Sequence, residues 1–172
     1  MKKLILFFIL FCITNTTYAY TIKAGISLTV NEARKISFEN VTPQIDISKY
    51  KKYFFDKNYK KNQNALKKGK YRYQNKYLTL FSNNSYAITY LYHKEIGFYY
   101  NSNGHLILIE YDLNKNYPVK RVRYDINGNL DSVSLSTSNK EDFIFDINKK
   151  LIAHWIGNNC YNEKGELTKT RY

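Results

Sequence analysis

The residues of this 172-residue chain that are best suited to covalent chemistry are Cys160 and His154, in the segment AHWIGNNCY. A nucleophilic cysteine needs a nearby base, because the thiolate attacks and the thiol does not. A turn at Gly157 would let a hairpin bring the two side chains together, although no oxyanion-hole motif accompanies them. The structural alternative is that Trp155 and Ile156 pack in the core while His154 faces a polar edge.

A second candidate site lies between Asp125 and Asp131, where an Asp or Asn occurs at every second residue. This is the ligand spacing of a calcium loop, since Ca²⁺ prefers oxygen ligands. The match fails further along, because Leu130 stands where that loop has glycine and Ser136 stands where it has a bidentate glutamate. The same residues suit an Asn-Gly hairpin, which is the interpretation we favour. We therefore expect no bound metal and no other cofactor.

A third candidate is a basic and aromatic stretch at residues 49–72, which holds ten basic residues and a single acid, Asp56. Lysines can neutralise an anionic polymer while tyrosines stack or pack on its rings. We expect this contact to come from six residues: Lys51, Lys52, Tyr53, Tyr59, Lys60 and Lys61. The alternative is an ordinary solvated face, because a genome rich in A and T would supply Lys, Asn, Tyr, Ile and Phe codons without selection for a basic surface.

A pattern that recurs four times in the last third of the chain predicts the β-hairpins that would position such residues. An aromatic residue is followed by Asp or Asn, then by a turn residue four positions after the aromatic, then by Leu two positions later. The copies are YNSNGHL from Tyr100, YDINGNL from Tyr124, FDINKKL from Phe145 and YNEKGEL from Tyr161. Asn-Gly supplies the positive φ of a tight hairpin, and the flanking apolar residues would share one face. The uneven spacing of the copies favours an irregular meander over a regular solenoid.

The copy from Tyr124 resembles the core of the YD repeat, the tyrosine-aspartate hairpin repeat of secreted and cell-surface Rhs-type proteins, and more loosely the MORN-type repeats of small bacterial proteins. The resemblance covers residues 100–167. In the third copy, Phe145 and Lys149 replace Tyr and Gly, and in the first and fourth copies Asn replaces Asp. The resemblance implies hairpin geometry and a non-catalytic, extracytoplasmic protein, and it transfers no functional residue.

Residues 1–19 have the features of a secretory signal peptide: a charged start, an apolar run that ends at Ile13 and a small-residue cleavage site at Ala19. The apolar run is about half the roughly 20 residues that a membrane-spanning helix needs. A lipoprotein signal at Cys12 is the alternative, and bulky Phe11 argues against it. We therefore expect an exported protein, periplasmic or extracellular, with no transmembrane segment in the mature chain.

Cleavage at this site would leave 153 residues, enough for one domain with its own core. The leader carries two lysines and no acid, so the net charge would fall from +13 to +11. Cys160 would be the one remaining cysteine, so packing without an intrachain disulfide must supply the stability. For an exported basic protein, an anionic glycan, a lipid headgroup or an acidic protein is a better partner than nucleic acid.

We predict a mainly β fold of the α+β class, an irregular antiparallel meander of hairpin repeats preceded by a short helical N-terminal segment. The boundaries are 1–19 for the leader, 20–70 for the helical and basic segment, and 71–172 for the meander with its four repeats. The residues expected to be largely buried are Leu106, Leu108, Tyr124, Leu130, Val133, Phe145, Leu151, Trp155 and Leu167.

Within the N-terminal segment, we predict a short strand over residues 20–30 and then a helix that ends before Pro43. Thr29 and Glu32 have the spacing of a capping box, which is typical of a helix start. A second helix is predicted over residues 48–55, followed by a polar loop over residues 57–70.

Together these features predict an exported, non-catalytic binding or structural module of the cell envelope that contacts an anionic component. Two alternatives stay open at this point. One is a thiol-dependent envelope enzyme that uses Cys160 and His154, and the other is an inhibitor or immunity-like protein with a basic binding face.

Overall fold

A computed structural model describes residues 28–81 and 83–170. The predicted leader lies outside the described residues, and so does most of the strand predicted over residues 20–30. The end of that strand is wrong, because Val30 begins a helix whose start is set by the Thr29 cap. No helix in the described part of the chain is long and apolar enough to cross a membrane.

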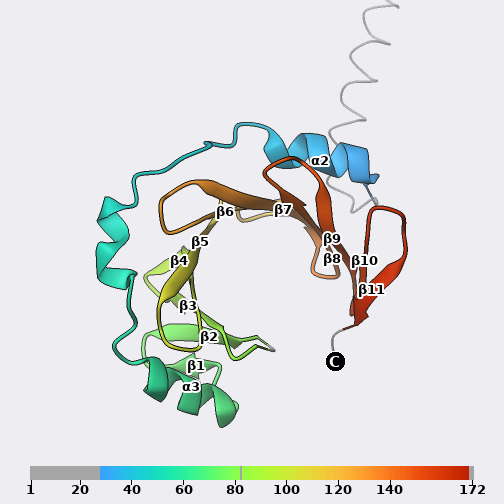
Figure 1. Cartoon of the computed structure of the whole chain (residues 1–172). Helices are drawn as coiled ribbons and strands as arrows, with labels where there is room; N and C mark the ends of the chain where they lie inside the picture. Colours follow the sequence, from blue (N-terminus) through green and yellow to red (C-terminus); the bar gives the residue numbers. More distant parts are fainter. Residues whose placement is uncertain (1–27, 82, 171–172) are drawn as a thin grey trace, which may run out of the picture.

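The body of the protein is one antiparallel sheet in which eleven strands follow one another in chain order, as predicted for a meander. Each strand pairs with the strands that precede and follow it in the sequence, so every connection is a hairpin (Figure 1). The strands are β1 (Arg72–Tyr73), β2 (Lys76–Leu80), β3 (Tyr86–Tyr90), β4 (His93–Tyr100), β5 (Leu106–Asp112), β6 (Val119–Tyr124), β7 (Leu130–Ser138), β8 (Glu141–Asp146), β9 (Leu151–Ile156), β10 (Asn159–Tyr161) and β11 (Leu167–Thr170).

The sheet bends into an open arc, and the N-terminal segment runs along its outer, convex side (Figure 1). Large side chains point outward from the strands, as Phe98 and Phe145 do, and they are buried there. Small side chains such as Ser132 and Ser134 alternate with them and point to the concave side. This division by size is specific to β7, because the neighbouring strand β6 places Arg121 and Arg123 on the same concave side, opposite Ser134 and Ser132.

The four sequence repeats form four hairpin turns with the same hydrogen bonds. The Asp or Asn of each copy accepts two backbone N–H bonds through Oδ1, one from the residue two positions later and one from the residue four positions later. The predicted turn residues all have positive φ, which is 83° at Gly104 and Gly128, 64° at Lys149 and 79° at Gly165. In each turn the backbone N–H of the turn residue also donates to the carbonyl oxygen of the Asp or Asn. The side-chain bonds reinforce this backbone turn, which explains why only Asp or Asn occupies the position.

Each repeat also carries a β-bulge at a fixed place. The aromatic residue pairs across the hairpin with the Leu of its own copy, as Tyr124 does with Leu130, and the residue after that Leu is skipped in the register. A bulge of this kind bends the strand and increases its twist, so the repeats contribute to the curvature of the sheet. The skipped residue falls outside the regular alternation of the strand, and Ile107 and Ile152, which occupy this position, are exposed within apolar strands.

The N-terminal strap, which we define as residues 28–70, covers the convex face and crosses the sheet in the reverse of strand order. Its first element, α2 (Val30–Phe38), begins with the predicted capping box, in which Thr29 and Glu32 bond each other's backbone N–H. Ala33 of α2 packs on Leu135 and Phe145. The strap then passes over β6 and β7 through Val41 and Ile45.

The second half of the strap holds η1 (Ser48–Tyr53), a 3₁₀ helix, and α3 (Tyr59–Lys67). The first lies within the helix predicted over residues 48–55. The second corrects the polar loop predicted over residues 57–70. The fully buried apolar residues of α3 are Ala65 and Leu66, which are too few to predict a helix from periodicity. Burial against the sheet stabilises this helix.

Two isolated β-bridges fix the strap to the hairpin turns. Gln44 pairs with Asn129, and Phe55 pairs with His105. At the first bridge the N–H of Ile45 donates to the carbonyl oxygen of Gly128 at 2.9 Å, so the strap backbone lies directly against the turn glycine. The first two repeats therefore do more than reverse the chain, because their turns pair with the backbone of the strap.

The burial predictions hold for most of the selected residues. Leu106, Tyr124, Val133, Phe145 and Leu151 are buried, whereas Leu108, Leu130 and Trp155 are half-buried. The prediction for Leu167 is wrong, since 58% of this residue is exposed. Its strand follows β10 at the end of the sheet, beyond the strands that α2 covers.

The serines at positions 132, 134 and 136 depart from expectation in the opposite direction. Because they alternate with apolar residues, the pattern predicts that they face solvent, yet each is at most 6% exposed. They lie on the concave side, where the long side chains of neighbouring strands lie over them, as Arg121 does over Ser136. Alternation thus predicts the face correctly and the solvent exposure incorrectly.

Candidate functional site

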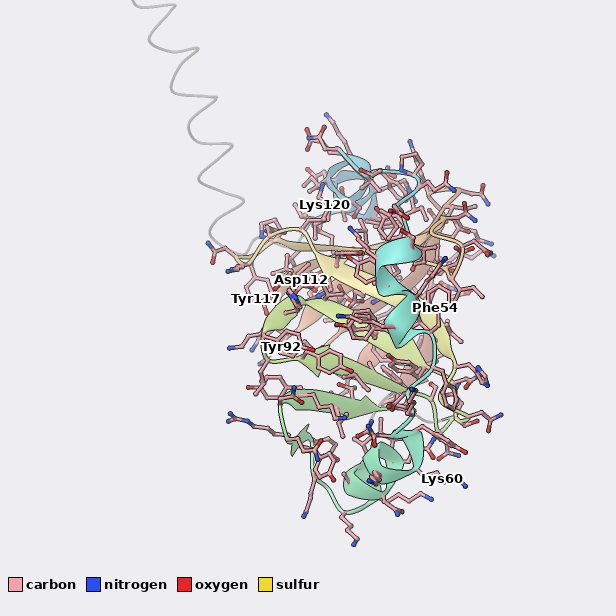
Figure 2. All side chains as sticks on the ribbon, turned by 90° about the vertical axis from the view of Figure 1, so that its left-hand side faces the viewer. Phe54, Lys60, Tyr92, Asp112, Tyr117 and Lys120 are labelled. Atoms are coloured by element: carbon pink, nitrogen blue, oxygen red, sulfur yellow. The ribbon has the colours of Figure 1, made fainter. Side chains whose placement is uncertain are left out.

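The lysines of the basic stretch lie on the outer surface of the strap and face solvent. All nine lysines between residues 49 and 70 are exposed, and within the described residues none of them forms a salt bridge. Figure 2 looks onto this side of the molecule, with Lys60 on α3. The nine are Lys49, Lys51, Lys52, Lys57, Lys60, Lys61, Lys67, Lys68 and Lys70.

The tyrosines predicted to share this site point the other way. Tyr53 stacks on Phe98 with ring centroids 4.2 Å apart, and Tyr59 packs against the core below α3. Lys52 and Lys60 lie over the rings of Tyr53 and Tyr59 at 4.9 and 5.8 Å from the centroids. The lysines are therefore exposed along the second half of the strap, whereas the two tyrosines hold η1 and α3 on the sheet.

Cys160 and His154 lie on neighbouring strands, but their side chains are on opposite faces of the sheet. In the pairing of β9 with β10, Cys160 stands opposite Trp155 and Tyr161 stands opposite His154. Successive residues of a strand alternate between faces, so His154 and Cys160 point to different sides. The imidazole instead stacks on Phe143 at 4.0 Å and contacts Glu141 through Nε2 at 3.0 Å. This arrangement gives the thiol no base from His154.

We expect Cys160 to react slowly with a thiol probe in the folded protein, because it is 2% exposed. The same probe should label the unfolded chain rapidly at neutral pH. The measurement is the labelling rate of the native and the urea-unfolded protein, with His154→Gln as a second variant. A rapid native rate that falls in this variant would show that the imidazole does activate the thiol.

The residues with the spacing of a calcium loop serve the hairpin turn, which is the interpretation favoured from the sequence. Asp125 accepts from the N–H groups of Asn127 and Asn129 at 2.8 and 2.9 Å, and these backbone bonds help to lower the pKa of its carboxyl, although burial opposes the shift. Within residues 28–81 and 83–170, no group of three His, Cys, Asp or Glu side chains is placed to hold a metal ion. The oxygen spacing therefore reflects turn chemistry.

A chain of polar contacts runs across the concave face. Arg121 donates from Nε to Asp112 at 2.8 Å and from Nη1 to Ser136 at 2.6 Å, and Ser136 donates to Asp142 at 2.8 Å. Burial raises the pKa of the Asp142 carboxyl, against the hydrogen bond from Ser136 and the nearby Arg121. A parallel ion pair joins Arg123 Nε to Glu110 at 2.6 Å. These contacts hold both guanidinium groups in fixed orientations.

The first of these ion pairs forms the floor of a cavity of about 870 Å³, which we call the edge pocket. The pocket lies between the β3–β4 turn and the β5–β6 loop, and Tyr92, Asp112 and Tyr117 lie together at this edge of the sheet (Figure 2). Tyr92 and Tyr117 are 58% and 49% exposed, so both rings are open to solvent at the pocket. Its further lining includes Lys94, Glu95, Leu113, Lys115 and Val119.

Both tyrosines are held by their own elements. Tyr92 stacks on Tyr90 with ring centroids 5.3 Å apart. The loop that carries Tyr117 is closed by Asn114, whose Nδ2 donates to the carbonyls of Asn116 and Pro118 and whose Oδ1 accepts from the Lys120 N–H. Three hydrogen bonds from one side chain make this loop a defined structure, so the pocket wall is formed before any ligand arrives.

The residues of the edge pocket were absent from the sequence prediction. Two features of the sequence could have indicated them. The first is the loop LNKNYP, the longest connection after residue 105 that lacks the repeat pattern. The second is the presence of an aspartate before this loop and an arginine after it. Neither feature reveals that Asp112 and Arg121 are register partners, because that depends on the hairpin length.

Comparison of the chain with protein-family models, with curated proteins and with solved structures found no match. The site must therefore be interpreted from its own geometry and charge.

Proposed function

We propose that this chain is an exported, non-catalytic binding module of the cell envelope that contacts an anionic partner through the lysines of its N-terminal strap. Export is proposed from the leader-like residues 1–19. The observation that most supports binding is that nine lysines within residues 49–70 are exposed and form no salt bridge within the described residues.

Unpaired lysines support this proposal more strongly than net charge does. A surface that balances its charges internally has little attraction for a partner, whereas exposed cations on one segment add their fields. The strap is also fixed to the sheet at two turns, so its lysines keep their relative positions. A fixed array binds a polyanion with less loss of conformational entropy than a flexible tail does.

The experiment is a pull-down of the mature protein against envelope fractions at low and high salt. We expect any bound component to be anionic and to dissociate as ionic strength rises past about 0.15 M, where exposed charges more than roughly 8 Å apart are screened. Treating the fractions with glycosidase, lipase or protease beforehand distinguishes a glycan, a lipid and a protein as the source of the negative charge.

The test variant changes Lys51, Lys52, Lys60 and Lys61 to Gln, and we expect it to lose at least tenfold in affinity. Tenfold corresponds to about 1.4 kcal/mol, or roughly 0.35 kcal/mol for each of the four lysines, which is below the limit of about 1 kcal/mol for a lysine near an anionic surface. All four are exposed, so the fold should stay intact. Binding that ignores both salt and these four changes would overturn the proposal.

A further inference from the structure

The edge pocket has the form of a small-molecule site. Its volume of about 870 Å³ falls within the range of ligand cavities. Five of its eleven lining residues are aliphatic or aromatic, and the other six carry a charge or an amide. It shares none of its lining residues with the basic stretch at residues 49–72. A ligand here would therefore be recognised separately from the anionic partner of the strap.

The floor of the pocket offers an acceptor and donors side by side. Asp112 uses Oδ1 to accept from Arg121, and its second oxygen makes no hydrogen bond within the described residues. Arg121 uses Nε and Nη1, and its Nη2 makes none there either. A hydroxyl group both donates and accepts, so two neighbouring hydroxyls can bond the carboxylate and the guanidinium together.

The charges around the floor argue against a fully charged ligand. Burial raises the pKa of the Asp112 carboxyl, Arg121 opposes this shift, and the carboxylates of Glu110 and Glu95 add to it. A ligand anion would meet these carboxylates, and a ligand cation would meet the Lys94 and Lys115 side chains in the lining. A neutral ligand rich in hydroxyls avoids both penalties.

The two exposed tyrosines supply the apolar half of the recognition. Tyr92 and Tyr117 present ring faces that can pack on the C–H face of a sugar ring while leaving its hydroxyls free. We propose that the edge pocket binds a neutral oligosaccharide made of pyranose rings, with Asp112 and Arg121 bonding adjacent hydroxyls and the two tyrosines packing on the ring faces.

The experiment follows backbone amide resonances during titration with three neutral trisaccharides that differ in linkage or in sugar: cellotriose, maltotriose and N,N′,N″-triacetylchitotriose. We expect at least one of them to shift the resonances of residues 91–95 and 112–121 at millimolar concentration, equally at low and high salt. Tyr92→Ala and Tyr117→Ala should each weaken this binding roughly tenfold, which is the effect of losing one aromatic contact. The matched control is Tyr71→Ala, which removes an exposed tyrosine outside the pocket and should change nothing.

The outcomes separate this site from the strap. Two results together support the pocket: binding persists in the variant with glutamine at positions 51, 52, 60 and 61, and it disappears in Asp112→Ala. The amide spectrum of Asp112→Ala must remain that of the folded protein for this comparison. No shift with any of the three trisaccharides would overturn the proposal. So would binding that survives both tyrosine changes.

Discussion

Replacing Gly128 by Val should destabilise the protein by about 3 kcal/mol or more. Gly128 has a φ of 83°, a conformation that costs a β-branched residue roughly 1–2 kcal/mol. A Cβ at this position would also lie 2.3 Å from the carbonyl oxygen of Ile45, which is backbone and has no freedom to rotate away. The strap would have to leave the turn, which would cost the Ile45–Gly128 hydrogen bond as well.

The control for this prediction is Gly165→Val in the fourth repeat. Gly165 has a φ of 79°, and a Cβ there would meet nothing within 4 Å. Gly165→Val should therefore lower the free energy of unfolding only by the cost of the positive φ, about 1–2 kcal/mol. The measurement is the free energy of unfolding in urea for both variants. Equal losses in the two variants would mean that the strap does not rest on the second turn.

Replacing Asp56 by Ala should be at least as damaging, at about 3–5 kcal/mol. This buried carboxylate accepts from the Tyr86 hydroxyl at 2.6 Å, from Asn62 Nδ2 at 2.7 Å and from the N–H of Asn58 at 2.9 Å. Burial, with the hydrogen bond to Asp56, raises the pKa of the Tyr86 hydroxyl, which therefore stays protonated and donates. Burial also lowers the pKa of Lys76, and the charge of Asp56 opposes that shift.

Removal of Asp56 would leave two buried donors without an acceptor and a buried lysine without its countercharge. Asp46→Ala is the matched control, because Asp46 accepts from the Ser48 N–H in the same local pattern but is exposed. Its loss should cost no more than about 1 kcal/mol. Urea unfolding of the two variants measures the difference, and similar values would show that the Asp56 cluster does not join the strap to the sheet.

The hairpin repeats could be predicted because their determinants are local. Seven residues contain both determinants of each turn: a glycine that takes a positive φ, as at Gly104 and Gly128, and an Asp or Asn side chain that accepts from the backbone N–H four residues later. The capping box at Thr29 is equally local. The turns, the meander and the first helix follow from such short-range rules.

The features that were missed depend on distant partners. The second helix of the strap, α3, is stable because the sheet covers Ala65 and Leu66, and no short-range pattern encodes that cover. Leu167 is exposed because the strap does not reach β11, although its sequence copy matches the buried ones. Bulges after each repeat leucine also change which residues are exposed, and their effect appears only once both strands are paired.

The candidate site divides in the same way. The exposure of the lysines at positions 51, 52, 60 and 61 could be expected from their chemistry, since lysine is almost never buried unless paired. The inward position of Tyr53 required the sheet, because its stacking partner Phe98 is 45 positions away in the sequence. The edge pocket required the register of β5 against β6 and the fold of the intervening loop.

The most direct test of the strap proposal is a calorimetric titration of polyglutamate into three forms of the mature protein. Polyglutamate carries carboxylates and no sugar, so the edge pocket contributes nothing to its binding. The three forms are the natural sequence, the strap variant with glutamine at positions 51, 52, 60 and 61, and a control with glutamine at the exposed lysines Lys140, Lys150, Lys164 and Lys169. Both variants lose the same net charge. We predict that the strap variant loses at least roughly tenfold in affinity while the control keeps most of it. Equal losses in the two variants, or none in either, would contradict a binding surface on the strap.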